Sequence, residues 1–361
     1  MRYEAQKYMI RAFAKILIML GTLALIGAQC ISFGGGGASQ GAGGGIFKSA
    51  NRGDEWLQKV AIPTASGMKN FGGTNVTALA VDPQDHLAIY AGTRESGMFY
   101  SYDGGESWMQ TTNIKSGFVA TVAVDPKNKC VVYAATGNRI MKSVDCNRSF
   151  EPIYNESAGE TFVTALSISP FNSAVLYAGN AKGALIKSTD GGLAWSNQGN
   201  LRGRIVDIVA DPRNSSILYA AVAGRGVWKS ENGGETFRDL SENMKAIKDV
   251  KDVRRLVADR ATPNALLLAS RHKLSRTTDG GLTWTALPIV SPETIALLAL
   301  TVNPKNSKEI YYGTATTFYR SSDGGEKWST EKLPTKLQAS YLLVDPENTT
   351  TIYLGVLEVK K

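Results

Sequence analysis

Short apolar stretches recur along most of the chain, each followed by a polar turn. VTALAV at residues 76–81 and GMFYS at residues 97–101 have the period-two alternation that is typical of strands. No segment after residue 45 carries a long 3.6-residue period, so extended helices are not expected there. The pattern predicts an all-β domain built from many short strands.

One motif, S-x-D-x-G-x-x-W with variations, recurs seven times, and we call it the box. Five of the six Trp occupy its last position. Its Asp-Gly-Gly centre predicts a hairpin turn, because Gly readily adopts the positive φ that such turns require. Successive copies begin 52, 42, 45, 42, 47 and 44 residues apart, at Ser49, Ser101, Ser143, Ser188, Ser230, Thr277 and Ser321.

A second motif alternates with the box. It is an apolar run, then Asp-Pro or a relative, then a Tyr eight residues after the Asp, as in LAVDPQDHLAIYAG at residues 79–92. Its Asp-Pro-x-Asn form predicts a turn, because Pro presets one backbone dihedral and Asx side chains bond back to the main chain. Counting the variants at Ser169, Asp259 and Asn303 gives seven copies, with Leu267 replacing Tyr in one of them.

Together the two motifs predict four short strands in every 45 or so residues, which is the content of one propeller blade. We therefore predict a seven-bladed β-propeller of four-stranded antiparallel blades over residues 46–361. The region begins with a box hairpin and ends with an Asp-Pro hairpin. Residues 46–60 and about 340–359 are thus expected to share one blade, which closes the ring and removes open sheet edges.

The first 45 residues depart from this pattern. Four basic residues and one acid lead into the apolar residues 16–28, which is the arrangement of a secretory signal. The following LIGAQC resembles a bacterial lipobox, which implies lipidation of Cys30. Cleavage after Ala28 and an uncleaved anchor are the alternatives. The Gly-rich residues 31–45 predict a flexible tether.

The chain is thus expected to divide into a signal segment (1–30), a tether (31–45) and the propeller (46–361). Each alternative for the signal sends the propeller across a membrane. We expect it in the cell envelope, anchored to the membrane on the extracytoplasmic side, with free secretion as the less favoured outcome.

The seven boxes resemble the Asp-box, or BNR, repeat over residues 46–361. Propellers with this repeat include sialidases, xyloglucanase-type glycoside hydrolases, the sortilin (Vps10) receptor domain and photosystem II assembly factors. The pairing of VDP…YAGT with KSTDGG most resembles the xyloglucanase, sortilin and assembly-factor branch. A single seven-bladed domain behind an export signal is most similar to the assembly-factor type.

The resemblance implies that the box is structural, and its chemistry agrees. An Asp carboxylate can accept N–H bonds within its own hairpin, and the box aromatic can pack between blades. The residues assigned this structural role are Asn51, Asp103, Asp145, Asp190, Asn232, Asp279 and Asp323.

Loops on the opposite face from the turns carry basic residues at similar positions in successive blades. A converging ring of Arg suits a carboxylate or an acidic peptide, through paired charge-assisted hydrogen bonds. Ordinary surface Lys and Arg are the alternative explanation. The predicted ring consists of Arg94, Arg139, Lys182, Arg202, Arg204, Arg225, Arg271 and Lys273.

The residue counts narrow the chemistry further. Net charge is +8, and +5 without the first 30 residues, so nucleic acid is not an expected partner. Three Cys and two His predict no metal site, and no cofactor motif is present. Cys130 and Cys146 lie near the adjoining ends of neighbouring strands and are candidates for a disulfide. We expect a monomeric propeller that binds a protein or glycan ligand.

Enzyme activity is not expected from the sequence. The sialidase Arg-Ile-Pro-type motif is absent, and xyloglucanase-type enzymes build their cleft between two propellers, whereas one is predicted here. The segment YAGTRESG resembles their YARTDVGG, in which the Asp is catalytic, but Arg94 stands at that position and Glu95 follows it. The favoured interpretation is a membrane-anchored binding scaffold that assists membrane-complex assembly. The alternative is a glycan-binding or glycoside hydrolase-like propeller.

Overall fold

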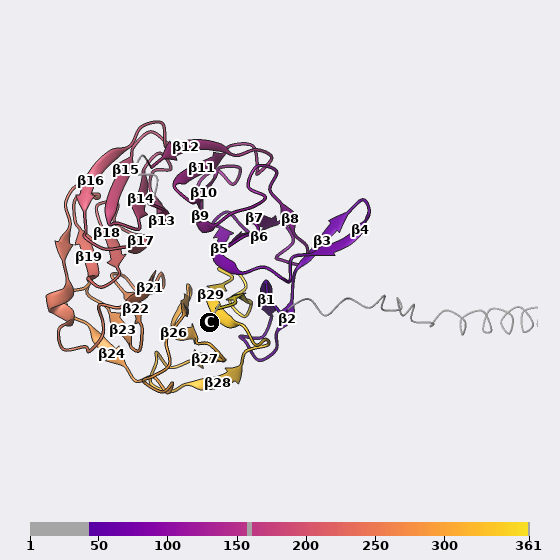
Figure 1. The fold of residues 1–361 in the computed structure, drawn as a ribbon. Coiled ribbons are helices and arrows are strands. Elements are labelled where there is room, and N and C mark those ends of the chain that lie inside the picture. Colours follow the sequence, from indigo (N-terminus) through magenta and orange to yellow (C-terminus); the bar gives the residue numbers. More distant parts are fainter. Residues whose placement is uncertain (1–42, 157–160, 360–361) are drawn as a thin grey trace, which may run out of the picture. The chain divides into compact units, whose positions relative to one another are not determined.

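The computed structural model describes residues 43–156 and 161–359, which form seven four-stranded blades arranged in a ring (Figure 1). This confirms the predicted all-β, seven-bladed propeller. Cavities lined by the inner strands of the blades make up a central channel. A single 3₁₀ turn, η1 (Ser241–Met244), is the helical element among the described residues. The predicted signal segment with Cys30 lies outside them.

Blades 1 to 6 follow one another along the chain, and the first strand of each lines the channel. Blade 1 contains β5 (Val76–Asp82), β6 (Asp85–Thr93), β7 (Met98–Ser101) and β8 (Met109–Gln110). Blade 2 contains β9 (Val119–Val124), β10 (Val132–Thr136), β11 (Arg139–Ser143) and β12 (Glu151–Asn155). Blade 3 contains β13 (Val163–Ile168), β14 (Leu176–Asn180), β15 (Ala184–Ser188) and β16 (Ser196–Asn200).

The next three blades repeat the same antiparallel order. Blade 4 contains β17 (Ile205–Ala210), β18 (Leu218–Val222), β19 (Gly226–Ser230) and β20 (Arg238–Asp239). Blade 5 contains β21 (Val253–Ala258), β22 (Leu266–Ser270), β23 (Leu274–Thr277) and β24 (Thr285–Leu287). Blade 6 contains β25 (Ala299–Asn303), β26 (Asn306–Gly313), β27 (Thr317–Ser321) and β28 (Ser329–Lys332).

The seventh blade joins the two ends of the propeller, and we call it the closing blade. Its strand order is β2 (Leu57–Gln58), β1 (Ile46–Ser49), β30 (Ile352–Leu357) and β29 (Gln338–Val344). β1 and β30 run antiparallel, with Ile46 opposite Gly355 and Ser49 opposite Ile352. The predicted splice of N- and C-terminal strands is therefore present.

One element is absent from the sequence-based prediction. A two-stranded hairpin, β3 (Ala61–Thr64) and β4 (Gly67–Asn70), projects outward between the closing blade and blade 1 (Figure 1). Its strands are mostly exposed, including Met68 with 70% of its surface accessible. The hairpin explains why the first two boxes are 52 residues apart rather than 42 to 47.

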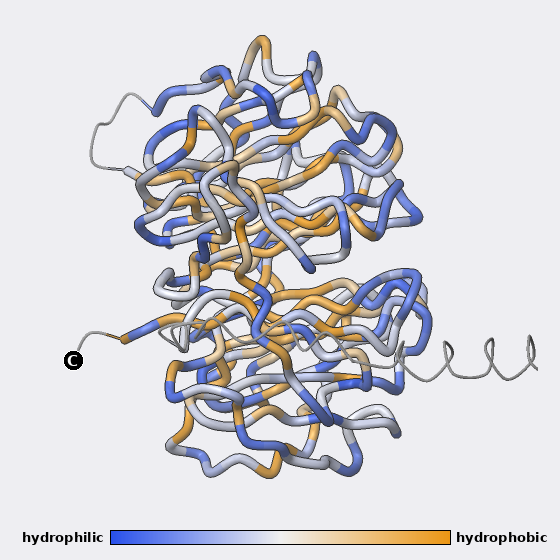
Figure 2. Tube along the Cα trace, turned by 90° about the vertical axis from the view of Figure 1, so that its right-hand side faces the viewer, coloured by the Kyte–Doolittle hydropathy of each residue, from blue (hydrophilic) through white to orange (hydrophobic). Residues whose placement is uncertain are grey.

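The hydrophobic core lies between the blades. The cluster between the closing blade and blade 1 contains Ile46, Val76, Ile89, Trp108 and Tyr353, all fully or almost fully buried. Figure 2 shows apolar segments running through the interior of the ring, with polar segments gathered at the turns. Because both faces of a blade are covered by its neighbours, each blade depends on the next for stability.

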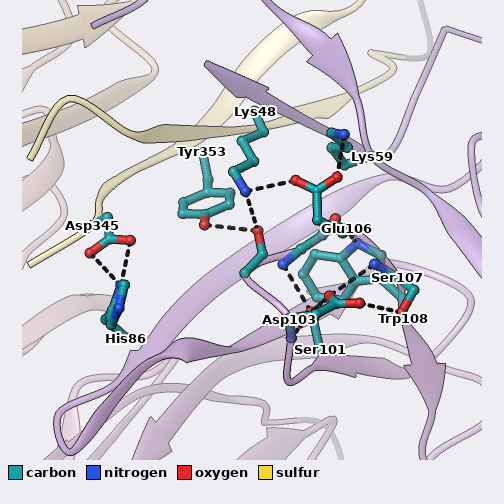
Figure 3. A network of polar contacts seen from close by, with 12 residues as sticks. Lys48, Lys59, His86, Ser101, Asp103, Glu106, Ser107, Trp108, Asp345 and Tyr353 are labelled. Carbon is teal, nitrogen blue, oxygen red and sulfur yellow. Dashed lines mark hydrogen bonds and ion pairs between the residues drawn. The ribbon is translucent and has the colours of Figure 1, made fainter. Parts of the chain in front are cut away.

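The seams between blades also have a recurring polar contact. In the closing blade, Lys48 lies opposite Tyr353, with its Nζ 5.8 Å from the ring centroid. Both side chains donate to the carbonyl of Gly104 in the box of blade 1, at 2.8 and 2.9 Å (Figure 3). The same cation and aromatic ring pair in blades 2, 3 and 4, as Lys142 with Tyr133, Lys187 with Tyr177 and Lys229 with Tyr219.

Candidate functional site

The disc has two chemically different faces. The box turn of blade 1 lies beside its Asp-Pro turn, since the Gly104 N–H donates to the carbonyl of Leu87 at 2.9 Å. We call the face with these turns the box face. The opposite side, which we call the loop face, holds the turns from second to third strands and the connections between blades.

The polar groups of the boxes are used within their own hairpins. In blade 1 the Ser101 hydroxyl donates to Asp103 at 2.7 Å and accepts from the Gly105 N–H at 2.9 Å. Asp103 also accepts from the Ser107 N–H at 2.9 Å (Figure 3). The matching Ser or Thr hydroxyl donates in each of the other boxes, to Asn51, Asp145, Asp190, Asn232, Asp279 and Asp323.

These hydrogen bonds stabilise the ionised form of the box carboxylates. The hydroxyl and N–H of Ser149 lower the pKa of Asp145 to about 2. An acid that is ionised this strongly and tied into its turn is a poor proton donor for catalysis. The candidate reactive groups are therefore those on the loop face and in the channel.

Glu95 is an exposed carboxylate on the loop face, in the turn between β6 and β7. Its two oxygens lie 3.3 and 3.2 Å from the amide nitrogen of Asn75, which orients the carboxylate. The turn itself is tightly fixed, because Gly97 has a φ of +69° and a Cβ there would lie 1.9 Å from the carbonyl oxygen of Ile114. Glu95 is thus an accessible acid on a rigid support.

The neighbouring Arg94 is engaged differently. Its guanidinium donates to the main-chain carbonyl of Glu358 at 3.1 Å, so it ties blade 1 to the end of β30. The main-chain N–H of Glu358 in turn donates to the Asn75 side chain. In the segment YAGTRESG, the acidic group presented to solvent is therefore Glu95.

The predicted basic ring is discontinuous. Lys273 pairs with Glu293 at 2.7 Å, and Arg271 lies 3.9 Å from Asp252. In the part of the chain that the structure describes, the other ring residues form no ion pair. Five of them follow blades 2 to 4 as an exposed series, which we call the basic arc: Arg139, Lys182, Arg202, Arg204 and Arg225.

Two members of the basic arc touch directly. Arg225 donates from Nε to the main-chain carbonyl of Arg202 at 3.2 Å. Arg202 has a φ of +59°, a conformation in which its carbonyl can be reached from the next loop. The Arg225 guanidinium is therefore held beside the loop that carries Arg202.

The channel contains a network that the sequence analysis missed. Arg255 donates to Asp207 at 2.7 Å and also to the hydroxyl of Tyr341, and its guanidinium lies 4.1 Å from the Tyr341 ring centroid. Asp207 accepts from the Leu256 N–H as well, at 2.8 Å. Burial raises the pKa of Asp207, and the charge of Arg255 opposes that rise.

From the sequence, the alternating charges of residues 242–255 predict a solvated surface turn that carries Arg255 at its end. The structure instead places it in β21, with its side chain in the channel. The insertion is not a solvated turn either, because Met244 and Val250 are buried in the cluster between blades 4 and 5. The alternating charges of the segment obscured this apolar pair.

Cys130 and Cys146 form a disulfide, with their Cα atoms 3.8 Å apart. The bond joins the start of the second strand of blade 2 to its box, where Cys-Asn replaces Gly-Gly. Among residues 43–156 and 161–359 there is no cluster of three potential metal ligands. The same residues include no helix with the length and hydropathy of a membrane span.

No family model matches the chain. Two curated proteins are similar to parts of it, and both are named xyloglucanase. The protein from Paenibacillus sp is 33% identical over 87 residues, which are 24% of this chain and 8% of the relative. The protein from Hypocrea jecorina is 31% identical over 140 residues, which are 33% of this chain and 16% of the relative.

Solved structures share the fold at low sequence identity. The GH74 enzyme of Niastella koreensis has a TM-score of 0.63 at 19% identity, covering 82% of this chain and 53% of its own. The GH74 xyloglucanase of Xanthomonas campestris has a TM-score of 0.65 at 17% identity, covering 84% and 52%. YCF48 bound to a D1 peptide has a TM-score of 0.61 at 14% identity, covering 84% and 96%.

The prediction that the chain is not an enzyme is wrong on these comparisons. Both curated relatives are xyloglucanases, so the class they point to is glycoside hydrolase. The prediction relied on the presence of a single propeller and on Arg94 at the expected acid position. The chain spans about half the length of the two GH74 proteins, and an exposed carboxylate is present one residue further on, at Glu95.

Proposed function

We propose that this propeller binds a xyloglucan-type polysaccharide on its loop face and takes part in its hydrolysis. The observation that carries the proposal is Glu95, an exposed and oriented carboxylate within the segment that resembles the xyloglucanase motif. The names of the two curated relatives support the choice of substrate.

Glycoside hydrolysis requires two carboxyl groups on either side of the scissile bond. Glu95 is proposed as the one that contacts the glycosidic oxygen or the attacking water. In the described residues, Glu156 and Glu358 are further loop-face carboxylates on neighbouring blades that form no ion pair. Glu156 is held by the Tyr154 hydroxyl at 3.2 Å and the Asn180 amide at 3.0 Å, so it is fixed as Glu95 is.

The test is release of reducing ends from xyloglucan by the purified chain, alongside binding to xyloglucan in affinity electrophoresis. Glu95→Gln is expected to lower hydrolysis at least about 100-fold while binding is retained, because removing a general acid or base costs that much or more. Glu326→Gln is the matched control, since Glu326 is an exposed Glu on the box face. Unchanged hydrolysis in Glu95→Gln, or no binding by the parent chain, would exclude the proposal.

A second candidate is binding of an acidic peptide along the basic arc. It is favoured by one observation, namely that the chain covers 96% of YCF48 in its structure with a D1 peptide. A row of exposed Arg and Lys side chains suits carboxylates. Arg202→Glu with Arg225→Glu should abolish binding of an acidic peptide in fluorescence anisotropy and leave xyloglucan binding intact. Unchanged peptide binding in this double variant would favour the polysaccharide alone.

We also propose that the propeller is exported and anchored by residues 1–30. The basic and apolar composition of that segment supports this, and so does the disulfide, because disulfides persist in oxidising compartments. Mass spectrometry of the mature N-terminus from isolated membranes distinguishes lipidated Cys30 from cleavage after Ala28 and from an intact segment. A full-length chain recovered only from cytosol would exclude export.

A further inference from the structure

The seam between blades 1 and 2 departs from the other six on the box face. The third strand of each blade carries one residue opposite the Tyr, or Leu267, of the second strand. In blade 1 this residue is Tyr100, which lies opposite Tyr90. In the other six blades it is a cation: Lys48, Lys142, Lys187, Lys229, Arg276 and Arg320.

The cation occupies space at the seams where it is present. Lys48 and Lys142 reach into the next blade and donate to the turn carbonyls of Gly104 and Gly191, both at 2.8 Å. At the seam between blades 1 and 2, the equivalent carbonyl is that of Cys146 in the box of blade 2, and it accepts instead from the hydroxyl of Tyr102 at 3.2 Å. The turn carbonyl therefore has a hydrogen-bond donor without a cation. The space that a Lys side chain occupies at the other seams is left free.

A cavity of about 380 Å³ lies at this seam, and we call it the seam pocket. Its size falls within the range of small-molecule sites in proteins. The side chains that give it chemical character are Asp82, Asp85, Tyr100, Tyr102, Lys129 and Arg148.

The aromatic wall of the seam pocket is fixed. The rings of Tyr100 and Tyr102 have centroids 5.2 Å apart. The Tyr102 hydroxyl accepts from the amide of Asn147 at 2.8 Å while it donates to Cys146. Asn147 replaces a Gly of the box and is buried, so the unusual box of blade 2 positions this ring.

Asp82 has an unused hydrogen-bonding atom. Its side chain is almost fully buried, Oδ1 accepts from the Gln84 N–H at 2.8 Å, and Oδ2 has no partner among the described residues. Burial raises the pKa of this carboxyl. In three other blades the equivalent Asp has a partner from the next blade: Asp125 pairs with Ser173, Asp259 with Ser307 and Asp345 with His86.

An acceptor that is buried without a partner costs free energy that a ligand hydroxyl or N–H can recover. The two acids of the seam pocket are balanced by Lys129 and Arg148, so its formal charge is zero and a neutral ligand fits better than an ion. Two aromatic rings, tilted by 58° to one another, beside hydrogen-bonding groups of both kinds suit a ring that carries several hydroxyls.

We propose that the seam pocket binds a pyranose sugar, whose ring face packs on the Tyr100 and Tyr102 wall and whose hydroxyl donates to Asp82. Lys129 and Arg148 donate to other hydroxyls of the sugar. This site is on the box face, so it is separate from the loop-face function proposed above and does not depend on it.

The experiment uses methyl β-glucoside, methyl β-galactoside and methyl β-xyloside as probes, in saturation-transfer NMR and titration of the whole chain. At least one should bind with a dissociation constant on the order of 1 mM, as expected for a ligand of this size. Tyr100→Lys restores the residue type of blades 2, 3 and 4, and should fill the pocket, keep the fold and weaken sugar binding at least about tenfold.

Lys187→Ala is the control, since it alters the equivalent position of the seam between blades 3 and 4 and should leave sugar binding unchanged. Glu95→Gln should also bind the sugar normally, which separates this site from the loop face. The proposal is overturned if no probe binds, if Tyr100→Lys binds as the parent does, or if tetramethylammonium binds in place of the sugars.

Discussion

Arg255 of blade 5 lies over the ring of Tyr341 in the closing blade, with its guanidinium carbon 4.1 Å from the ring centroid. Blade 6 separates these two blades along the ring, so the contact spans part of the channel. Cavities of about 270 and 190 Å³ both have Arg255 and Tyr341 in their walls. The pair therefore forms part of the wall of both cavities and links two blades that are not neighbours.

Replacing Arg255 by Ala should destabilise the propeller by about 3 kcal/mol, because Asp207 is left buried without its cation. Tyr341→Phe removes one hydrogen bond and should cost about 1 kcal/mol. Urea unfolding followed by Trp fluorescence measures both. Asp207→Asn combined with Arg255→Ala should be less costly than the sum of the single changes, and strict additivity would contradict the coupling.

A second prediction concerns His86, which joins blade 1 to the closing blade through a 2.9 Å contact between its Nδ1 and Asp345 (Figure 3). The hydrogen bond to Asp345 raises the pKa of His86 above its usual value. The protonated form is therefore favoured by folding. The added stability should be complete below about pH 6.5, the unfolded pKa, and should disappear as pH rises through the folded pKa.

His86→Asn isolates this effect. The difference in melting temperature between the parent chain and His86→Asn should be largest near pH 5 and should shrink towards pH 8. An NMR titration of the His86 ring gives the folded pKa directly. A difference that grows with rising pH would show that the contact favours neutral imidazole.

The ring closure, the strand number and the role of the boxes could be predicted from sequence because each depends on local chemistry repeated seven times. Asp-Pro and Asp-Gly-Gly specify turns, and their spacing specifies the blade. The channel network was not predictable in this way. Asp207, Arg255 and Tyr341 lie on three different blades and occupy the same position of the repeat, which holds Ala or Thr in the other four blades. Only the closed ring brings them together.

The seam pocket could not be predicted from the sequence either, although its key residue stands out there. Tyr100 is visible in the sequence as one departure from a Lys or Arg position once the register is known. This departure leaves a cavity because Tyr102, held by Asn147, donates to the turn carbonyl next to it. The basic ring was predicted from loop positions alone, and the partners of Arg271 and Lys273 became visible only with the packing of Asp252 and Glu293.

A third prediction uses the natural variation among the boxes. Burial raises the pKa of Asp279, but the hydroxyl and N–H of Thr283 outweigh burial and bring it down to about 2. Its contribution to stability should be complete above about pH 4, the unfolded pKa, and lost as pH falls towards 2. Asn232 accepts the same N–H bond, at 3.0 Å from Thr236, with a neutral amide.

Asp279→Asn should therefore fold normally at pH 7 and lose this part of the acid dependence. Asp279→Ala should cost about 1 to 2 kcal/mol, because the turn N–H groups lose their acceptor. Thermal unfolding from pH 2 to pH 7 measures the three chains. Equal acid sensitivity in the parent chain and in Asp279→Asn would show that the carboxylate does not contribute.

The last prediction concerns the box of blade 2, where Cys146 and Asn147 adopt φ values of 58° and 69°. The matching positions of five other boxes are Gly, which takes these angles without strain. The disulfide closes a loop with a sequence separation of 16, so its loss should cost about 3 kcal/mol. Cys130→Ser with Cys146→Ser should show that full cost.

Cys130→Ser with Cys146→Gly should recover about 1 kcal/mol, because Gly relieves the left-handed backbone. Urea unfolding gives the free energy of unfolding of both variants, with the reduced parent chain as reference. Equal stability of the two variants would show that Cys146 carries no backbone strain.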